Sequence, residues 1–167
     1  MDIKTEALNY IKDRYIEEQS RFNHFEEKCG KLVTLMTIVV GIFASLVGFK
    51  SKVIFSPASE IEWLILLVCG TISLVLACAW GHALLALKLG ECPVAPKSRV
   101  NADYILGASD EKSLEHMIDC YVDTTEKLSV VIDRKAQNIE HAYNEMSIAA
   151  WISGLLVILI AIKELLI

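Results

Sequence analysis

The last third of the chain carries an apolar stripe that continues without a break into an uncharged run. Between residues 111 and 146 the stripe repeats at spacings of four and three residues, a heptad pattern that predicts a helix packed along other helices. Its positions are Leu114, Ile118, Tyr121, Thr125, Leu128, Ile132, Lys135, Ile139, Ala142 and Met146. Residues 146–162 then hold no charged side chain. The pattern therefore predicts one helix with a soluble first part, 111–145, and a membrane-spanning end, 146–162.

The first part of the chain repeats the same spacing of apolar residues and predicts an amphipathic helix over residues 1–31. Glu18 is its polar exception, and its apolar members are Leu8, Ile11, Tyr15, Phe22, Phe25, Cys29 and Leu32. Uncharged runs over 32–49 and 63–87 are long enough to cross a bilayer. A turn over 50–62 joins these two runs, and a loop over 88–110 leads to the long helix. The predicted fold is an all-α integral membrane protein with three transmembrane helices and a cytoplasmic helical bundle.

The distribution of basic residues predicts how the three spans are oriented. Residues 1–31 carry six Lys or Arg and residues 88–145 carry seven, whereas the opposite side has Lys50, Lys52 and Lys163. Because basic residues are concentrated on the cytoplasmic side of membrane proteins, the N-terminus and both soluble helices are expected in the cytoplasm. Both of these helices run toward the membrane. They are therefore expected to pack in parallel, within one chain or between neighbouring chains.

Composition narrows the class of protein. Hydrophobic residues make up 54% of the 167 residues, more than in an average soluble domain. The net charge of −5 disfavours free nucleic acid as a partner. The first 31 residues contain 13 charged side chains and no apolar run, so no cleavable signal peptide is expected. The five cysteines are odd in number and form no CxxC pair, which predicts reduced thiols.

Each predicted span has a face of small or weakly polar residues, which allow helices to approach closely in lipid. The first span carries Thr34, Thr37, Gly41, Ser45 and Gly48, the second Gly70, Ser73, Ala77 and Gly81, and the third Ala150 and Gly154. Two interpretations remain open: plain helix packing, or a face that lines a pore. Three spans do not readily enclose an aqueous path alone. A pore therefore requires a homo-oligomer, most simply a cyclic one such as a tetramer.

A few polar residues interrupt these apolar patterns and are candidates for gating or signal contact. His82 is the one titratable side chain besides cysteine within a predicted span. Thr125 and Lys135 are the polar members of the long seam. His116 and Cys120 share a helix face, but two ligands do not make a metal site. No catalytic motif occurs, so no catalytic, cofactor or metal residue is predicted, and an enzyme is not expected.

Two segments carry a resemblance to a known family. Residues 21–49 (RFNHFEEKCGKLVTLMTIVVGIFASLVGF) and 128–162 (LSVVIDRKAQNIEHAYNEMSIAAWISGLLVILIAI) are similar to the first span and last helix of small transmembrane effectors of bacterial anti-phage defence, especially Pycsar transmembrane effectors. In that group an acidic residue, a lysine and small residues precede the first span. Here those positions are Glu26, Glu27, Lys28, Cys29, Gly30 and Lys31, and Lys135 and Ala142 match positions of the last helix.

The resemblance implies an effector of the bacterial inner membrane that disrupts the bilayer as an oligomeric pore or ion channel. A nucleotide-type signal, or a partner protein that synthesises nucleotides, would act on its cytoplasmic helices. Pycsar effectors often carry a cyclic-nucleotide-binding domain, for which this chain has no room, so the trigger is either a ligand of the cytoplasmic helices or a partner. The alternative is a membrane-anchored scaffold or regulatory subunit that recruits a soluble partner. No cofactor is expected.

Overall fold

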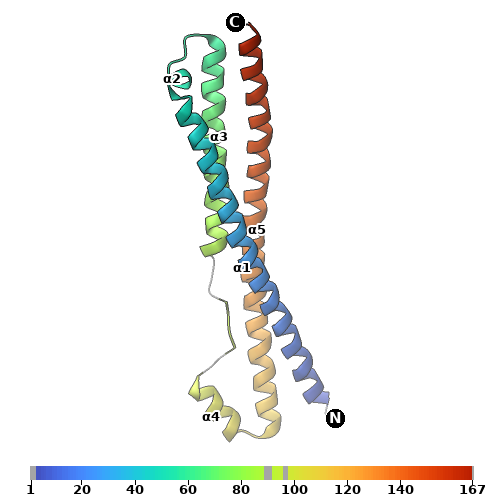
Figure 1. The fold of residues 1–167 in the computed structure, drawn as a ribbon. Helices are drawn as coiled ribbons and strands as arrows, with labels where there is room; N and C mark the ends of the chain where they lie inside the picture. Colours follow the sequence, from blue (N-terminus) through green and yellow to red (C-terminus); the bar gives the residue numbers. More distant parts are fainter. Residues whose placement is uncertain (1–2, 89–91, 96–97, 167) are drawn as a thin grey trace. The chain divides into compact units, whose positions relative to one another are not determined.

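A computed structural model describes residues 3–88, 92–95 and 98–166 of the chain, and these residues form helices without strands (Figure 1). The helices are α1 (Ile3–Phe49), α2 (Ser51–Ile54), α3 (Glu60–Lys88), α4 (Arg99–Gly107) and α5 (Asp110–Leu166). Three of them, α1, α3 and α5, are long and apolar enough to cross a membrane. The all-α fold with three candidate spans agrees with the sequence, and it indicates a membrane protein.

The long helix expected near the C-terminus is present as α5, which has no break between its charged and uncharged parts. It contains no proline, and Asp110 and Glu111 place negative charge in its first turn, where the helix dipole favours it. Helix α1 is also continuous, so the expected helix over 1–31 and span over 32–49 are one element. Gly30 does not end the helix, because a single glycine weakens a helix by only about 1 kcal/mol.

The described parts of the two connecting segments contain short helices that the sequence analysis did not predict, while residues 89–91 and 96–97 of the second segment lie outside the described residues. The predicted turn over 50–62 contains the short helix α2. The predicted loop over 88–110 contains α4, which makes the loop assignment wrong for nine residues. Ser98 starts α4 as its N-cap, because its side-chain oxygen accepts a hydrogen bond from the backbone N–H of Asn101 at 3.3 Å.

The contacts divide the chain into two compact units, each described here by itself. The first unit comprises Met1–Glu27 and Leu89–Ala136, and the second comprises Lys28–Lys88 and Gln137–Ile167. Helices α1 and α5 contribute residues to both units. The sequence analysis placed the divisions at residues 31 and 145. The three-helix packing in fact begins earlier on α5, since Ile139 and Ala142 already belong to the core of the second unit.

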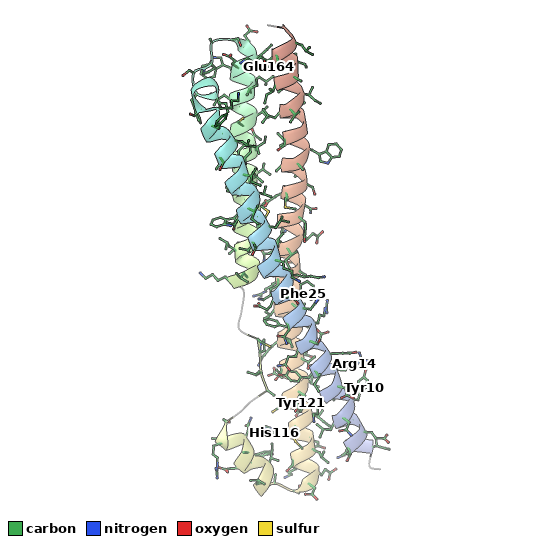
Figure 2. All side chains as sticks on the ribbon, in the orientation of Figure 1. Tyr10, Arg14, Phe25, His116, Tyr121 and Glu164 are labelled. Atoms are coloured by element: carbon green, nitrogen blue, oxygen red, sulfur yellow. The ribbon has the colours of Figure 1, made fainter. Side chains whose placement is uncertain are left out.

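In the first unit, the N-terminal part of α1 packs in parallel on the N-terminal part of α5. The rings of Tyr15 and Tyr121 lie 5.5 Å apart, and Phe22 packs with Leu128 and Ile132 further along both helices. Figure 2 shows Tyr121 on α5 beside this part of α1. All ten predicted seam positions of α5 are buried or half-buried. The heptad pattern was therefore a correct prediction of which face packs.

In the second unit, α1, α3 and α5 share an apolar core of mostly small and aliphatic side chains. Met36 of α1, Ile72 and Ala79 of α3 and Ala149 of α5 are central to it. The buried alanines at one face of α3 let the neighbouring helices approach closely. No charged side chain belongs to this cluster. The ionisable groups of the unit that are described next lie at its two ends.

Candidate functional site: ion pairs and small-residue faces

Lys135 occupies a buried position in the α1–α5 seam of the first unit. Its side chain is 0% exposed, and its ammonium group forms an ion pair with the carboxylate of Glu26 on α1. The same Nζ lies 4.9 Å from the ring centroid of Phe22, in the geometry of a cation–π contact. A buried ammonium is stable only when it is paired, so Glu26 and Phe22 explain how the seam tolerates this lysine. Lys135 is therefore part of the core and is not a solvated residue at the edge of the seam.

The position of Glu26 follows from helix geometry. Glu26 lies four residues after Phe22 and so shares its face of α1. Helical side chains tilt toward the N-terminus, so Lys135 reaches back along α5 to meet this carboxylate. Cys92 packs against the same cluster. Burial and the negative charge of Glu26 raise the pKa of the Cys92 thiol, while Lys135 partly lowers it.

Thr125, the other predicted polar seam position, is half-buried, and its hydroxyl donates to the Tyr121 carbonyl at 2.7 Å. Its neighbour Thr124 is more deeply buried and donates to the Cys120 carbonyl at 2.6 Å. On α1, the Oε2 atom of Glu18 is enclosed without a hydrogen bond among the described residues. The polar part of the seam thus includes Glu18, which the sequence pattern of the first helix marked as its polar exception, and Glu26, which that pattern did not mark.

His82 belongs to the second unit, where α5 supplies its partners. Its Nδ1 lies 2.8 Å from Oε2 of Glu145, and both side chains are half-buried. The rings of His82 and His141 lie 5.4 Å apart. Glu145 and His141 are four residues apart, so both face α3 from one side of α5. The sequence analysis identified His82 but missed both partners, because their contact depends on how α3 and α5 align.

A second ion pair lies at the opposite end of α3. The carboxylate of Glu62 accepts from Nζ of Lys163 on α5 at 2.8 Å, and both side chains are largely buried. Glu62 also accepts from the backbone N–H of Ala58 at 2.6 Å and that of Ser59 at 3.3 Å, while the hydroxyl of Ser59 accepts from the Glu62 N–H at 3.4 Å. These reciprocal hydrogen bonds form a capping box, and the Ser-x-x-Glu spacing that is typical of it is present in the sequence.

Replacing Ser59 with alanine should destabilise the start of α3. The substitution removes the hydroxyl that accepts from the Glu62 N–H, and losing an N-cap costs about 1 kcal/mol. We expect a lower thermal unfolding midpoint for purified Ser59→Ala protein in detergent. Ser56→Ala, an exposed serine outside the capping box, is the matched control and should leave the midpoint unchanged. Equal midpoints for both variants would contradict the role of the cap.

The predicted small-residue face of α1 points away from the packed core. Each residue of this face is exposed: Thr34, Thr37, Gly41, Ser45 and Gly48. The hydroxyls of Thr34, Thr37 and Ser45 donate to carbonyls of their own helix four residues earlier. A Cβ atom added at Gly41 or Gly48 would meet nothing within 4 Å. Most of this face is therefore exposed, although Thr37 accepts a hydrogen bond from the indole N–H of Trp80 at 3.4 Å and Gly48 lines a groove shared with α3.

The small-residue faces of α3 and α5 are also largely exposed. Gly70, Ser73 and Ala77 are exposed on α3 and Gly81 is half-buried, while Ala150 and Gly154 are exposed on α5. Between α1 and α3 lies a groove of about 430 Å³, lined mainly by apolar and small side chains. In lipid, such faces are the usual contact surfaces between helices. The arrangement therefore leaves helix-packing surfaces open on the outside of the second unit.

The predicted residues do not converge on one site. Lys135 and Thr125 belong to the first unit, whereas His82 and the small faces belong to the second. His116 and Cys120 do lie together, with Sγ and Nε2 3.7 Å apart. Within the described ranges, however, no group of three His, Cys, Asp or Glu side chains is placed to hold a metal ion. What the arrangement offers is paired charges inside helix contacts and open small-residue faces.

Comparisons with known proteins identify no relative of this chain. No family model matches the chain, and neither a curated protein nor a solved structure is significantly similar to it. Function must therefore be argued from the residues and their geometry.

Proposed function

We propose that this protein is a membrane-disrupting effector that acts as a homo-oligomeric pore or ion channel. The observation that carries the proposal is the outward direction of the small-residue faces on all three candidate spans. Because most of these small side chains are exposed, contact with other copies is the packing that they favour. The resemblance of residues 21–49 and 128–162 to small effectors of anti-phage defence supports the same assignment.

Oligomerisation follows from the core of the second unit. Leu32, Met36, Ile72 and Leu76 fill the space between the helices, so one chain offers no polar path through its own centre. A pore must instead form between copies, with cyclic symmetry as the simplest closed arrangement. The hydroxyl-bearing face of α1, with Thr34, Thr37 and Ser45, is the most polar outer surface of the uncharged runs and is our candidate for the pore lining.

The first unit is the proposed receiver of the signal. Its seam holds the buried pair of Lys135 and Glu26, which a nucleotide-type ligand or a partner protein would affect by shifting α1 against α5. Both helices also supply residues to the second unit. By the positive-inside rule, we place the first unit in the cytoplasm of a bacterial cell and the spans in its inner membrane.

Purified protein in liposomes tests the proposal. We expect ion or dye release that requires the trigger and rises with protein density, and loss of the inner-membrane potential when an activated form is expressed in bacteria. The matched control is protein heat-denatured before reconstitution. An intact membrane potential under confirmed activation would overturn the channel assignment.

A second candidate is a membrane-anchored scaffold that recruits a soluble partner. The first unit exposes several large apolar side chains outside the uncharged runs, among them Ile16, Leu106, Val122 and Val130, and an exposed apolar surface is a feature of partner-binding proteins. A partner captured by residues 111–145, together with no flux under any trigger, would favour the scaffold over the channel.

A further inference from the structure

The side chain of Trp151 on α5 points away from the packed core of the second unit. It is 83% exposed although it belongs to an uncharged, membrane-spanning run. Trp80 on α3 donates its indole N–H to Oγ1 of Thr37 at 3.4 Å. Trp151 has no such acceptor within the described part of the chain. An indole N–H in hydrocarbon without an acceptor costs free energy, so a contact that supplies one is favoured.

The groove between α1 and α3 is the complementary feature. It measures about 430 Å³. Its wall combines large apolar residues with the small residues Ala44 and Gly48 of α1 and Ser73 and Ala77 of α3. The small residues let an inserted ring come close to both backbones, and Ser73 offers a hydroxyl oxygen as an acceptor. The groove therefore has the size and chemistry to receive an indole.

Two contacts between α3 and α5 indicate that the groove and the Trp151 indole lie at the same depth. Each pair joins α3 to α5: His82 with Glu145 at one end and Glu62 with Lys163 at the other. Trp151 lies six residues beyond Glu145, about 9 Å along α5 at 1.5 Å per residue. The same distance along α3, measured from His82 toward Glu62, reaches residue 76, in the wall of the groove. The Trp151 indole and the α1–α3 groove therefore lie at the same depth within the second unit.

Equal depth matters because the symmetry axis of a membrane ring lies along the membrane normal. Rotation about this axis leaves depth unchanged, so a protrusion on one copy meets a hollow on the next only when both lie at one level. We propose that Trp151 of each copy inserts into the α1–α3 groove of a second copy, and that this head-to-tail contact builds the homo-oligomer. The inference rests on the homo-oligomer of the proposed function and names its interface.

The exposed area of the chain is sufficient for such contacts. The chain exposes 11254 Å². A monomeric soluble protein of 18.6 kDa exposes about 8,200 Å² by the usual scaling. The surplus of about 3,000 Å² exceeds the roughly 1,600 Å² buried in a standard interface. Ala150 and Gly154 flank Trp151 on α5 and let the whole helix face approach the groove.

Two exposed tryptophans allow a matched test. Trp151→Ala should dissociate the oligomer in detergent or nanodiscs, with at least a tenfold weaker association by analytical ultracentrifugation. Trp63→Ala removes an indole of the same size, 62% exposed, from the start of α3 and away from the groove, and it should leave the oligomer intact. Equal weakening by both variants, or no weakening by Trp151→Ala, would overturn the interface.

Cysteine crosslinking in membranes tests the contact itself. In a Cys78→Ser background, which removes the exposed thiol next to Ala77, the pair Ala150→Cys with Ala77→Cys keeps Trp151 in place and should form disulfides between chains. The pair Trp63→Cys with Ala77→Cys should not. Absence of crosslinks in an intact oligomer would assign the groove to a lipid acyl chain and overturn the proposal. Crosslinks without ion flux would support the interface and overturn the channel. Ion flux without crosslinks would support the channel and overturn the interface.

Discussion

Glu26→Gln should destabilise the first unit by about 2 kcal/mol, because it leaves the ammonium of Lys135 buried without its counter-charge. Breaking a fully buried pair costs about 3–5 kcal/mol, and the estimate is lower here because the Glu26 side chain is 38% exposed and water screens it. The measurement is chemical unfolding of purified protein, followed by circular dichroism. Glu17→Gln is the matched control: Glu17 pairs with Arg14 on the surface at 2.6 Å, and its loss should change stability by less than about 0.5 kcal/mol.

A double-mutant cycle separates the pair from general effects at position 26. Lys135→Leu replaces the buried charge by an apolar side chain, which is often neutral or stabilising in cores. In that background Glu26→Gln should cost almost nothing, since no buried ammonium remains to be compensated. Equal costs of Glu26→Gln with and without Lys135→Leu would show that the two residues do not interact. If the pair also controls gating, Lys135→Leu should retain assembly while its response to the trigger changes.

Gly41→Leu should weaken assembly without unfolding the chain. A Cβ at Gly41 meets nothing within 4 Å, so the fold of a single copy has room for the larger side chain. In the proposed oligomer the same side chain would hold neighbouring helices apart, and we expect association about tenfold weaker, or roughly 1.4 kcal/mol. Sedimentation and liposome flux are the measurements.

Thr71→Leu controls for added bulk on a lipid-facing surface. Thr71 is exposed on α3 outside the small-residue face formed by Gly70, Ser73, Ala77 and Gly81. It should leave both sedimentation and flux unchanged. Normal assembly of Gly41→Leu would show that the small face of α1 makes no contact with helices of other copies.

The sequence was sufficient to predict the helices that dominate this fold. Uncharged runs and heptad spacing depend on local composition, so the candidate spans and the seam from Leu114 to Met146 were readable directly. The partners of Lys135 and His82 could not be predicted in this way, because Glu26 and Glu145 contact them only when separate helices are aligned. The direction of the small-residue faces was equally inaccessible, since it depends on which side of each helix the core occupies. By contrast, the cap formed by Ser59 and Glu62 had a readable spacing that the sequence analysis did not use.

The scarcity of charge in the candidate spans also bears on how the proposed channel would respond to voltage. The runs 32–49, 63–81 and 146–162 contain no charged side chain; beyond them, His82 contacts Glu145 and Glu62 pairs with Lys163. An electric field acts on a span only through charge that moves across it, about 2.3 kcal/mol per elementary charge at 100 mV. These helices carry no such gating charge. Opening should therefore follow the trigger and remain nearly independent of the membrane potential.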